Sequence, residues 1–227
     1  MKRFLVGNPL DPLWIARRGL KRGIHAVAHH ARGRLLDVGC GVKPYRAMFA
    51  ACSAYVGIER PGTLSKSTVV DVWGDALALP IAAASFETVL CSEVLEHVPE
   101  PSALFAEAAR VLRPGGVLLL TTPQVWGLHE EPWDFFRYTK YGLAHLARKN
   151  GFAVVEVRPT CGTWAMVGQR TASFFFYSTG IVRVAPLNLL SRPFLAMWQL
   201  VFVALDELFG RRGDTLDNVL VARKEGA

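Results

Sequence analysis

Residues 34–41 put an acid and two glycines directly after an apolar run. The stretch reads RLLDVGCG, with Asp37 at the end of the run and Gly39 and Gly41 in the turn that follows. Two glycines separated by one residue let the backbone approach a ligand without interference from a Cβ atom. A carboxylate beside such a turn can accept hydrogen bonds from a cationic group of that ligand. We therefore interpret this stretch as a ligand-binding turn.

Two further acids stand where an α/β sheet could present them to the same ligand. Glu59 ends the apolar run AYVGIE, 18 positions beyond Gly41. Nucleotide-binding sheets place a carboxylate at about this separation to accept hydrogen bonds from ribose hydroxyls. Asp75, in GDALALP, could accept a hydrogen bond from an adenine amino group. The acids favour a ligand that contains adenosine.

The glycine pattern distinguishes between two such ligands. Dinucleotide sites use G-x-G-x-x-G, whose third glycine allows close helix packing beside a pyrophosphate. Here Pro44 stands in the third position. S-adenosylmethionine (SAM) has no phosphate, but it carries an ammonium and a sulfonium cation, which suit three acids and the lack of a basic cradle. The residues therefore favour SAM over NAD.

The segment HEEPWDFFRYT, residues 129–139, carries side chains that could handle an acceptor. Histidine titrates near neutral pH, so His129 is a candidate general base, and Asp134 could orient it or act as the base itself. Arg137 could hold a carboxylate or a phosphate. The aromatic residues that could exclude water are Trp133, Phe135, Phe136 and Tyr138. The alternative is a structural Asp134–Arg137 ion pair with core aromatics.

Apolar runs alternate with helical patterns along the chain. We expect strands at RLLDV, AYVGIE, FETVLCSEV, VLLLTTP, FAVVEV and NVLVA, and helices at YRAMFAACS, SALFAEAARVL and YTKYGLAHLARKNGF. Nearly continuous apolar strands that alternate with helices are typical of a doubly wound α/β sheet. Ligands of such sheets bind beyond the carboxyl ends of the strands, where both candidate segments are expected to lie.

In this order and spacing the segments resemble the class I SAM-dependent methyltransferases, with a methyltransferase type 11-like domain. The matching stretches are LLDVGCG, YVGIE, GDALALPIAAASFETVLCSEVLEHV and ARVLRPGGVLLLTTP, and LDNVLVARK resembles that fold's last, antiparallel strand. The resemblance covers about residues 34–158 and implies a mainly parallel seven-stranded sheet. It also implies methyl transfer from SAM.

The resemblance implies cofactor contacts residue by residue. The cofactor-binding residues would be Asp37, Gly39, Cys40, Gly41, Tyr45, Glu59, Asp75, Ala76, Cys91 and Ser92. The first turn would hold the methionine part, Glu59 the ribose, and Asp75 with Ala76 the adenine. Tyr45, where the family has a small residue, would either reach the cofactor carboxylate or pack. His97 resembles a family position, after the fourth strand, where the side chain usually packs, and catalysis there is the less favoured alternative.

The N-terminal segment carries the whole net charge of +7. Residues 1–36 hold eight basic residues against Asp11 alone, whereas residues 37–227 hold 18 basic and 18 acidic residues. A basic segment with interspersed apolar residues can lie on an anionic membrane surface, and a lid helix with a solvated basic face is the alternative. We take residues 1–33 as a basic helical segment before a methyltransferase domain at 34–227. The rest of the chain shows no basic stripe with aromatics, so nucleic acid is not an expected partner.

An apolar segment at about 159–213 interrupts the pattern before the last strand. Its longest uncharged run, Pro193–Leu205, has 13 residues, fewer than the roughly 20 of a membrane-spanning helix. We expect a helical insert that covers the core or lies in the plane of a membrane. Scattered cysteines and an N-terminal apolar run too short for a signal peptide indicate a cytoplasmic protein, with peripheral membrane association left open.

These features predict a SAM-dependent methyltransferase acting on a small-molecule, glycan or lipid-linked acceptor. The stretch WDFFRYTKYGLAHLARKNGF also resembles a segment of bacterial methyltransferases encoded among polysaccharide- and lipid-modifying enzymes. The alternatives are a module that binds SAM without turnover and, less favoured, an NAD-dependent oxidoreductase. No metal site is predicted, because no Cys or acid near His25, His29 and His30 completes a ligand set.

Overall fold

A computed structural model describes residues 8–62, 69–178, 184–210 and 213–226. The chain forms two compact units. The helical unit comprises the chain up to Arg22, Gln124–Trp126 and Pro159–Asp217, and the sheet unit comprises Gly23–Pro123, Gly127–Arg158 and the chain from Asn218 onward. This division follows packing, and the predicted domain boundary between residues 33 and 34 stays a prediction.

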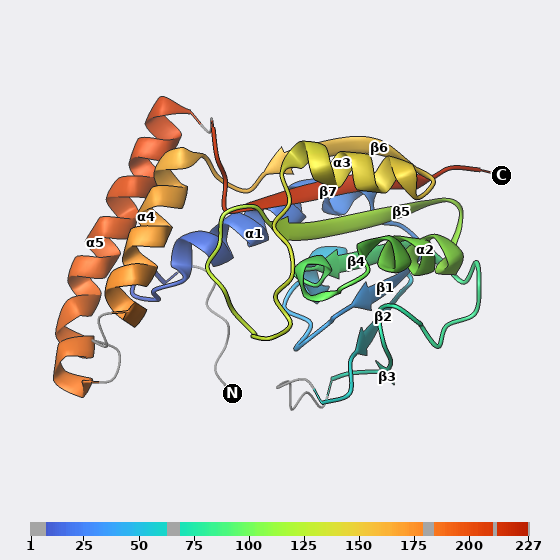
Figure 1. The fold of residues 1–227 in the computed structure, drawn as a ribbon, viewed down its shortest axis with the longest axis horizontal. Coiled ribbons are helices and arrows are strands. Elements are labelled where there is room, and N and C mark those ends of the chain that lie inside the picture. Colours follow the sequence, from blue (N-terminus) through green and yellow to red (C-terminus); the bar gives the residue numbers. More distant parts are fainter. Residues whose placement is uncertain (1–7, 63–68, 179–183, 211–212, 227) are drawn as a thin grey trace. The chain divides into compact units, whose positions relative to one another are not determined.

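The sheet unit is built on seven strands in the order β3-β2-β1-β4-β5-β7-β6 (Figure 1). The strands are β1 (Arg34–Val38), β2 (Ala54–Glu59), β3 (Val72–Trp73), β4 (Phe86–Ser92), β5 (Leu112–Pro123), β6 (Phe152–Pro159) and β7 (Asp217–Lys224). Strand β1 pairs in parallel with β2 and β4, as β2 does with β3 and β4 with β5. The predicted fold class, a mostly parallel α/β sheet with an antiparallel final strand, is confirmed.

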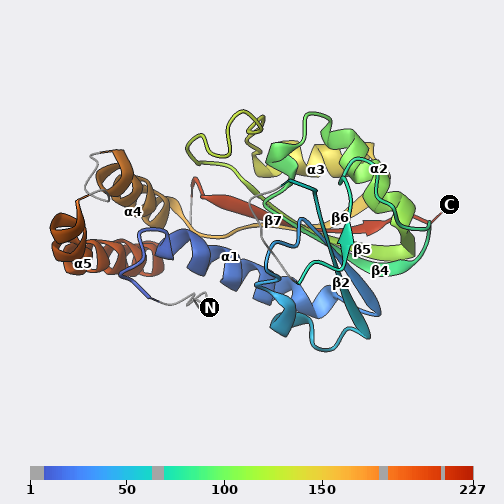
Figure 2. The ribbon, with the colours of Figure 1, turned by 90° about the horizontal axis from the view of Figure 1, so that it is seen from below.

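Each face of the sheet has its own apolar core, because side chains alternate along a strand. On one face Leu36 and Val38 pack with residues of α2 (Pro101–Val111) and α3 (Lys140–Lys149). On the other face Leu35 packs with the end of α1 (Trp14–Val27). Figure 2 shows α2 and α3 on one side of the strands and the end of α1 on the other. This packing fixes the carboxyl edge of β1, β4 and β5.

The helical unit contains the start of α1, helix α4 (Thr163–Ser173), a π-helical turn at Phe174–Ser178 and helix α5 (Ala185–Phe209). Helix α5 begins before the uncharged run Pro193–Leu205 and continues through Arg192 and Pro193. Proline removes one backbone donor, and the carbonyl of Leu189 that loses it lies on an exposed turn where water can replace the donor. By length and composition alone, Pro186–Phe209 could cross a membrane.

Two shorter elements also differ from the prediction. The helix expected at YRAMFAACS is a single 3-10 turn, Arg46–Phe49. The strand expected at FETVLCSEV ends at Ser92, because Glu93 adopts a positive φ of 55° that a strand does not allow. The chain then makes another 3-10 turn, Leu95–His97. Both turns lie at the edge of the sheet where the candidate site is found.

Candidate functional site

The predicted ligand-binding turn lies at the carboxyl end of β1, where the strand order reverses. Gly39 and Gly41 have φ values of +72° and +49°, in the left-handed region that favours glycine. A Cβ atom on Gly39 would clash with the side chain of Val94. A Cβ atom on Gly41 would meet no heavy atom within 4 Å. One glycine is therefore required by packing, and the other opens toward a space that a ligand can fill.

Asp37 is buried beside this turn. The Tyr55 hydroxyl donates a hydrogen bond to Asp37 Oδ2 at 2.5 Å. Burial raises the pKa of Asp37 to about 7, although the Tyr55 hydrogen bond and the charge of Lys43 act in the opposite direction. Within the described parts of the chain, no basic side chain forms an ion pair with Asp37. A bound cation would therefore stabilise its ionised form.

Lys43 is a residue of this turn that the sequence reasoning missed. Its side chain is buried, and its Nζ lies 2.5 Å from Asp71 Oδ2, which also accepts the backbone N–H of Gly57 at 2.7 Å. A Cβ atom at Gly57 would clash with the Lys43 side chain, so the glycine in YVGIE makes room for the lysine. Since Asp71 compensates the ammonium charge, the turn is no phosphate cradle.

The two other predicted acids end neighbouring strands. Glu59, at the end of β2, accepts the backbone N–H of Gly41 through Oε2 at 2.8 Å. Asp75 is exposed just after β3 and accepts the backbone N–H of Leu77 at 2.8 Å. Ala76 packs against the core on the α2 face. Three carboxylates at the ends of β1, β2 and β3 and an open glycine turn are a donor set that fits a cationic adenosyl ligand.

The remaining predicted cofactor residues lie in different surroundings. The side chains of Cys40 and Cys91 are buried, and Cys91 belongs to the core on the α2 face, so it can meet a ligand only through its backbone. Tyr45 packs against the core on the α1 face, which is the second of its two predicted roles. Ser92 Oγ lies 2.9 Å from the hydroxyl of Thr121.

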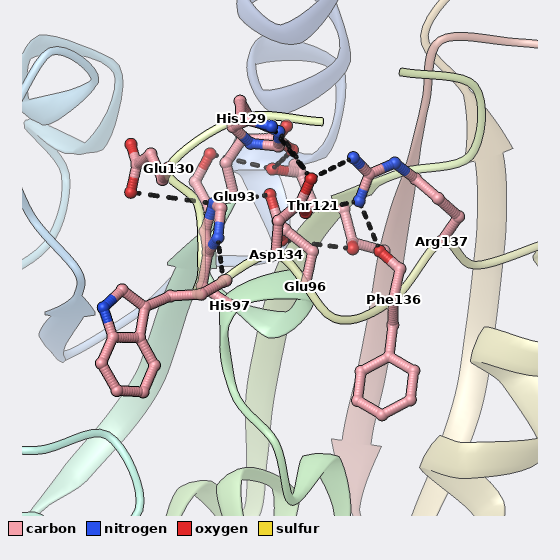
Figure 3. A network of polar contacts seen from close by, with 12 residues as sticks. Glu93, Glu96, His97, Thr121, His129, Glu130, Asp134, Phe136 and Arg137 are labelled. Atoms are coloured by element: carbon pink, nitrogen blue, oxygen red, sulfur yellow. Dashed lines mark hydrogen bonds and ion pairs between the residues drawn. The ribbon is translucent and has the colours of Figure 1, made fainter. Parts of the chain in front are cut away.

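The predicted acceptor segment is organised around Asp134 (Figure 3). Both terminal nitrogens of Arg137 donate to the Asp134 carboxylate at 2.7 Å, and the backbone N–H of His129 donates to it at 3.0 Å. The hydrogen bonds from Arg137 lower the pKa of Asp134 to about 2. Such an acidic carboxyl is a poor base at neutral pH. The geometry favours Asp134 as a support for His129.

Arg137 is engaged within its own segment. Besides the Asp134 carboxylate, its terminal nitrogens donate to the carbonyls of Phe136 at 2.7 Å and of Gly127 at 2.9 Å. The ion pair weighed as a structural alternative is therefore present. An acceptor carboxylate or phosphate would have to displace these partners.

His129 and His97 lie ring to ring, with centroids 4.7 Å apart in an edge-to-face arrangement. His129 Nδ1 lies 3.2 Å from the carbonyl of Gly127 and 3.3 Å from Asp134 Oδ2, and His97 Nδ1 lies 2.7 Å from the carbonyl of Trp133. Nδ1 thus faces an acceptor in both rings, which in a neutral imidazole leaves the lone pair on Nε2. The sequence reasoning gave His97 mainly a packing role and missed this pairing, because the two histidines are 32 positions apart.

One aromatic residue, Trp133, links the acceptor segment to the end of β2. The guanidinium of Arg60 lies over the ring of Trp133, 5.1 Å from its centroid. Because Arg60 follows Glu59 directly, this contact brings the segment beside the end of β2. Trp133, Phe135 and Phe136 are exposed, so a bound acceptor could cover them. Tyr138 packs against the core instead, and its buried hydroxyl has no hydrogen-bond partner among the described residues.

Relatives in sequence carry the same domain. Residues 36–120 match the model of a family described as a methyltransferase domain. An uncharacterised methyltransferase of Mycobacterium avium (strain 104) is 36% identical over 156 residues, which cover 63% of this chain and 58% of that protein. A ubiquinone biosynthesis O-methyltransferase of Aromatoleum aromaticum is 34% identical over 128 residues, or 51% of this chain and 50% of that protein. The chain spans about half the length of these relatives.

Solved structures share the fold. The [4+2]-cyclase SpnF superposes with a TM-score of 0.59 at 23% identity, over 91% of this chain and 81% of that one. Phosphoethanolamine N-methyltransferase 2 of Haemonchus contortus, in complex with SAM, gives 0.54 at 17% identity, over 98% and 59% of the two chains. At these identities the likeness shows the fold alone, and the cyclase is named for a different chemistry.

Fold, turn and acids together define an α/β domain that binds a cationic adenosyl ligand. Residues 36–120 match the methyltransferase domain model, and the predicted resemblance to SAM-dependent methyltransferases, with S-adenosylmethionine as the cofactor, is confirmed. The individual residue roles stay predictions.

Proposed function

We propose that the protein transfers a methyl group from SAM to an acceptor bound against residues 127–138. The observation that carries this proposal is the meeting of two polar regions at one edge of the sheet. The glycine turn with Asp37 ends β1, and the His97–His129 pair follows β4 and β5. The Arg60–Trp133 contact brings the acceptor segment beside Glu59, whose carboxylate accepts the backbone N–H of Gly41.

The chain's own residues would bind SAM, orient the acceptor and remove the acceptor's proton. Asp37, Glu59 and Asp75 would hold the ammonium, ribose and adenine parts of SAM, which when bound supplies an electrophilic methyl group. Alignment of the acceptor and exclusion of water account for much of the rate of such a displacement. An acceptor hydroxyl must also lose its proton, and this would occur at His129, oriented through Nδ1 by Asp134.

We further propose that the acceptor is lipid-linked and that the protein binds it at an anionic membrane surface, from the cytoplasmic side. Helix α5 exposes large apolar side chains, including Leu189 at 71% and Leu190 at 75%, and only 17% of its apolar window is buried. The residue ranges of the helical unit hold eleven Lys and Arg against five Asp and Glu, which is nearly the whole net charge of the chain. Apolar exposure combined with positive charge supports binding to an anionic surface.

Isothermal titration of the purified chain with SAM, with NAD as the control ligand, tests the activity first. We expect binding of SAM alone, weakened by Asp37→Ala. Methyl transfer from labelled SAM to lipid-linked glycan pools then separates an enzyme from a module that binds SAM without turnover. Binding of NAD in preference to SAM would contradict the proposal and favour an oxidoreductase.

Cosedimentation with vesicles tests the membrane part independently. At low salt we expect the chain to bind vesicles of anionic lipid and to bind neutral vesicles weakly. The double variant Leu189→Glu/Leu190→Glu should lose binding. Tyr141→Glu, at a residue of α3 in the sheet unit that is equally exposed at 75%, is the matched control. Equal sedimentation of all three proteins would contradict a role for α5.

A further inference from the structure

We propose that Glu96, His97 and His129 bind a divalent transition-metal ion at the carboxyl edge of β4 and β5 (Figure 3). One possible ligand atom from each residue lies within 4.8 Å of the others. Glu96 is fully buried, and the side chains of His97 and His129 are 15% and 30% exposed. The cluster is therefore sheltered and still open on one side, as a site that also receives a substrate must be.

The surroundings of both histidines suit metal ligands. A metal-binding imidazole almost always donates its other N–H to a carbonyl or a carboxylate, which fixes the ring and the tautomer. Here Nδ1 of His97 faces the Trp133 carbonyl, and Nδ1 of His129 faces Asp134 and the Gly127 carbonyl. In both rings Nε2 is left with the lone pair that a metal requires.

The spacing also fits an ion better than a direct contact. His97 Nε2 lies 3.7 Å from Glu96 Oε1 and 3.9 Å from Glu130 Oε2, beyond hydrogen-bond distance from both. Two ligands bound at about 2.1 Å to one tetrahedral ion are about 3.4 Å apart. Small rotations of the side chains would therefore close the cluster around an ion, with the exposed Glu130 beside it.

Two imidazoles and one carboxylate select a particular class of ion. Imidazole favours transition metals over Mg²⁺ and Ca²⁺, and three protein ligands leave an open position for water or substrate. This site was not predicted, because the spacing of its residues along the chain does not match a common metal-binding motif. Only the turn after β4 and the segment after β5 bring the three residues together.

The metal site extends the proposed function, and the role of the ion in the reaction rests on that function. An acceptor hydroxyl bound at the open position would lose its proton to water more readily, because the cation stabilises the oxygen anion. The oxygen would then form its bond to the methyl carbon as the carbon–sulfur bond breaks, with the electron pair kept on sulfur. His129 would act as a ligand rather than as a free base, and the acceptor would be an alcohol or a phenol.

Titration of the chelator-treated chain with Co²⁺, followed by visible absorption, tests the site without any acceptor. We expect one Co²⁺ per chain, displaced by Zn²⁺. His97→Ala and His129→Ala should each weaken Co²⁺ binding at least ~100-fold. Asp134→Asn changes only a residue that orients His129, and it should weaken Co²⁺ binding by roughly 10- to 100-fold. His145→Ala, at an exposed histidine of α3, is the matched control and should bind as the wild type does.

Circular dichroism and SAM titration of the metal-free variants show whether each variant is folded. No Co²⁺ binding by the wild type would overturn the metal site, as would unchanged binding by folded His97→Ala and His129→Ala. SAM binding by the metal-free chain bears only on the proposed function, so failure of one proposal is distinguishable from failure of the other.

Discussion

The turn after β1 and the segment after β5 each bury an aspartate, but the two carboxylates have opposite surroundings. Asp37 contacts the hydroxyl of Tyr55, and burial raises its pKa to about 7. Asp134 is held by both terminal nitrogens of Arg137, which lower its pKa to about 2. The same side chain at the same edge of one sheet therefore differs in charge near neutral pH.

This difference separates a binding group from a supporting group. Burial disfavours a carboxylate unless a cation or several donors compensate it. Asp134 has its cation within the chain, so its charge and position are fixed before any ligand arrives. Asp37 gains most from a cation that comes from outside, such as the ammonium of SAM. Both aspartates are buried, so burial does not distinguish their functions. The source of the compensating cation, within the chain or from a ligand, does distinguish them.

Removal of the internal cation should have the largest effect. Arg137→Met leaves Asp134 charged and buried, and we expect the free energy of unfolding to fall by about 3–5 kcal/mol, measured by urea denaturation. The double variant Arg137→Met/Asp134→Asn should recover part of this loss, because no unpaired charge remains. Arg148→Met, at an exposed arginine of α3, is the matched control. Equal stability of Arg137→Met and Arg148→Met would contradict the supporting role.

The two glycines of the turn after β1 offer a second contrast, between packed and open surroundings. Gly39→Ala combines a positive φ with a clash against Val94, and we expect a loss of about 2–4 kcal/mol in unfolding free energy. Gly41→Ala has only the conformational cost, about 1–2 kcal/mol. Its methyl group would nevertheless enter the open space, so SAM affinity should fall more than stability does.

Calorimetric titration and urea denaturation of both glycine variants check this contrast. A Gly41→Ala protein that binds SAM like the wild type would show that the open space is not the cofactor site. A Gly39→Ala protein as stable as Gly41→Ala would show that Val94 can move away.

The strands of the sheet were predictable where a run of apolar residues is closed by a turn. The bounds of β2 were predicted as observed, and β1 ends at Val38, one residue beyond the expected Asp37, because RLLDV and AYVGIE are each followed by such a closing sequence. Strand β3 has two residues, too few to show any periodicity. Helix α5 passes through Pro193, and the carbonyl of Leu189 that loses its donor lies on an exposed turn where water can replace it, which a local rule does not include.

The candidate site was predictable in its residue types and less so in its partnerships. Asp37, Gly39 and Gly41 were identified because they are neighbours in sequence. The pairing of His97 with His129 depends on how two separate segments turn at the edge of the sheet. The charge of Asp134 likewise depends on Arg137 being folded back onto it. Contacts of this kind require the backbone path, which local patterns do not specify.

The smallest predicted effect is the pH dependence that Asp37 contributes. Its folded-state pKa is raised above the ordinary value of 3.8, so its protonated form stabilises the unliganded fold and this contribution declines as pH rises toward and through 7. SAM requires the opposite form. If only ionised Asp37 pairs with the ammonium, SAM affinity should rise roughly fivefold from pH 6 to pH 7, below the range where an α-amino group itself titrates.

Calorimetric titrations of three proteins separate this effect from other titrating groups. Asp37→Asn should bind SAM more weakly and remove most of the rise in affinity between pH 6 and pH 7. Asp134→Asn should keep the rise, because Asp134 is already ionised throughout this range. If Asp37→Asn keeps the slope and Asp134→Asn loses it, the binding carboxylate is the one after β5, and the two regions have exchanged the roles assigned to them.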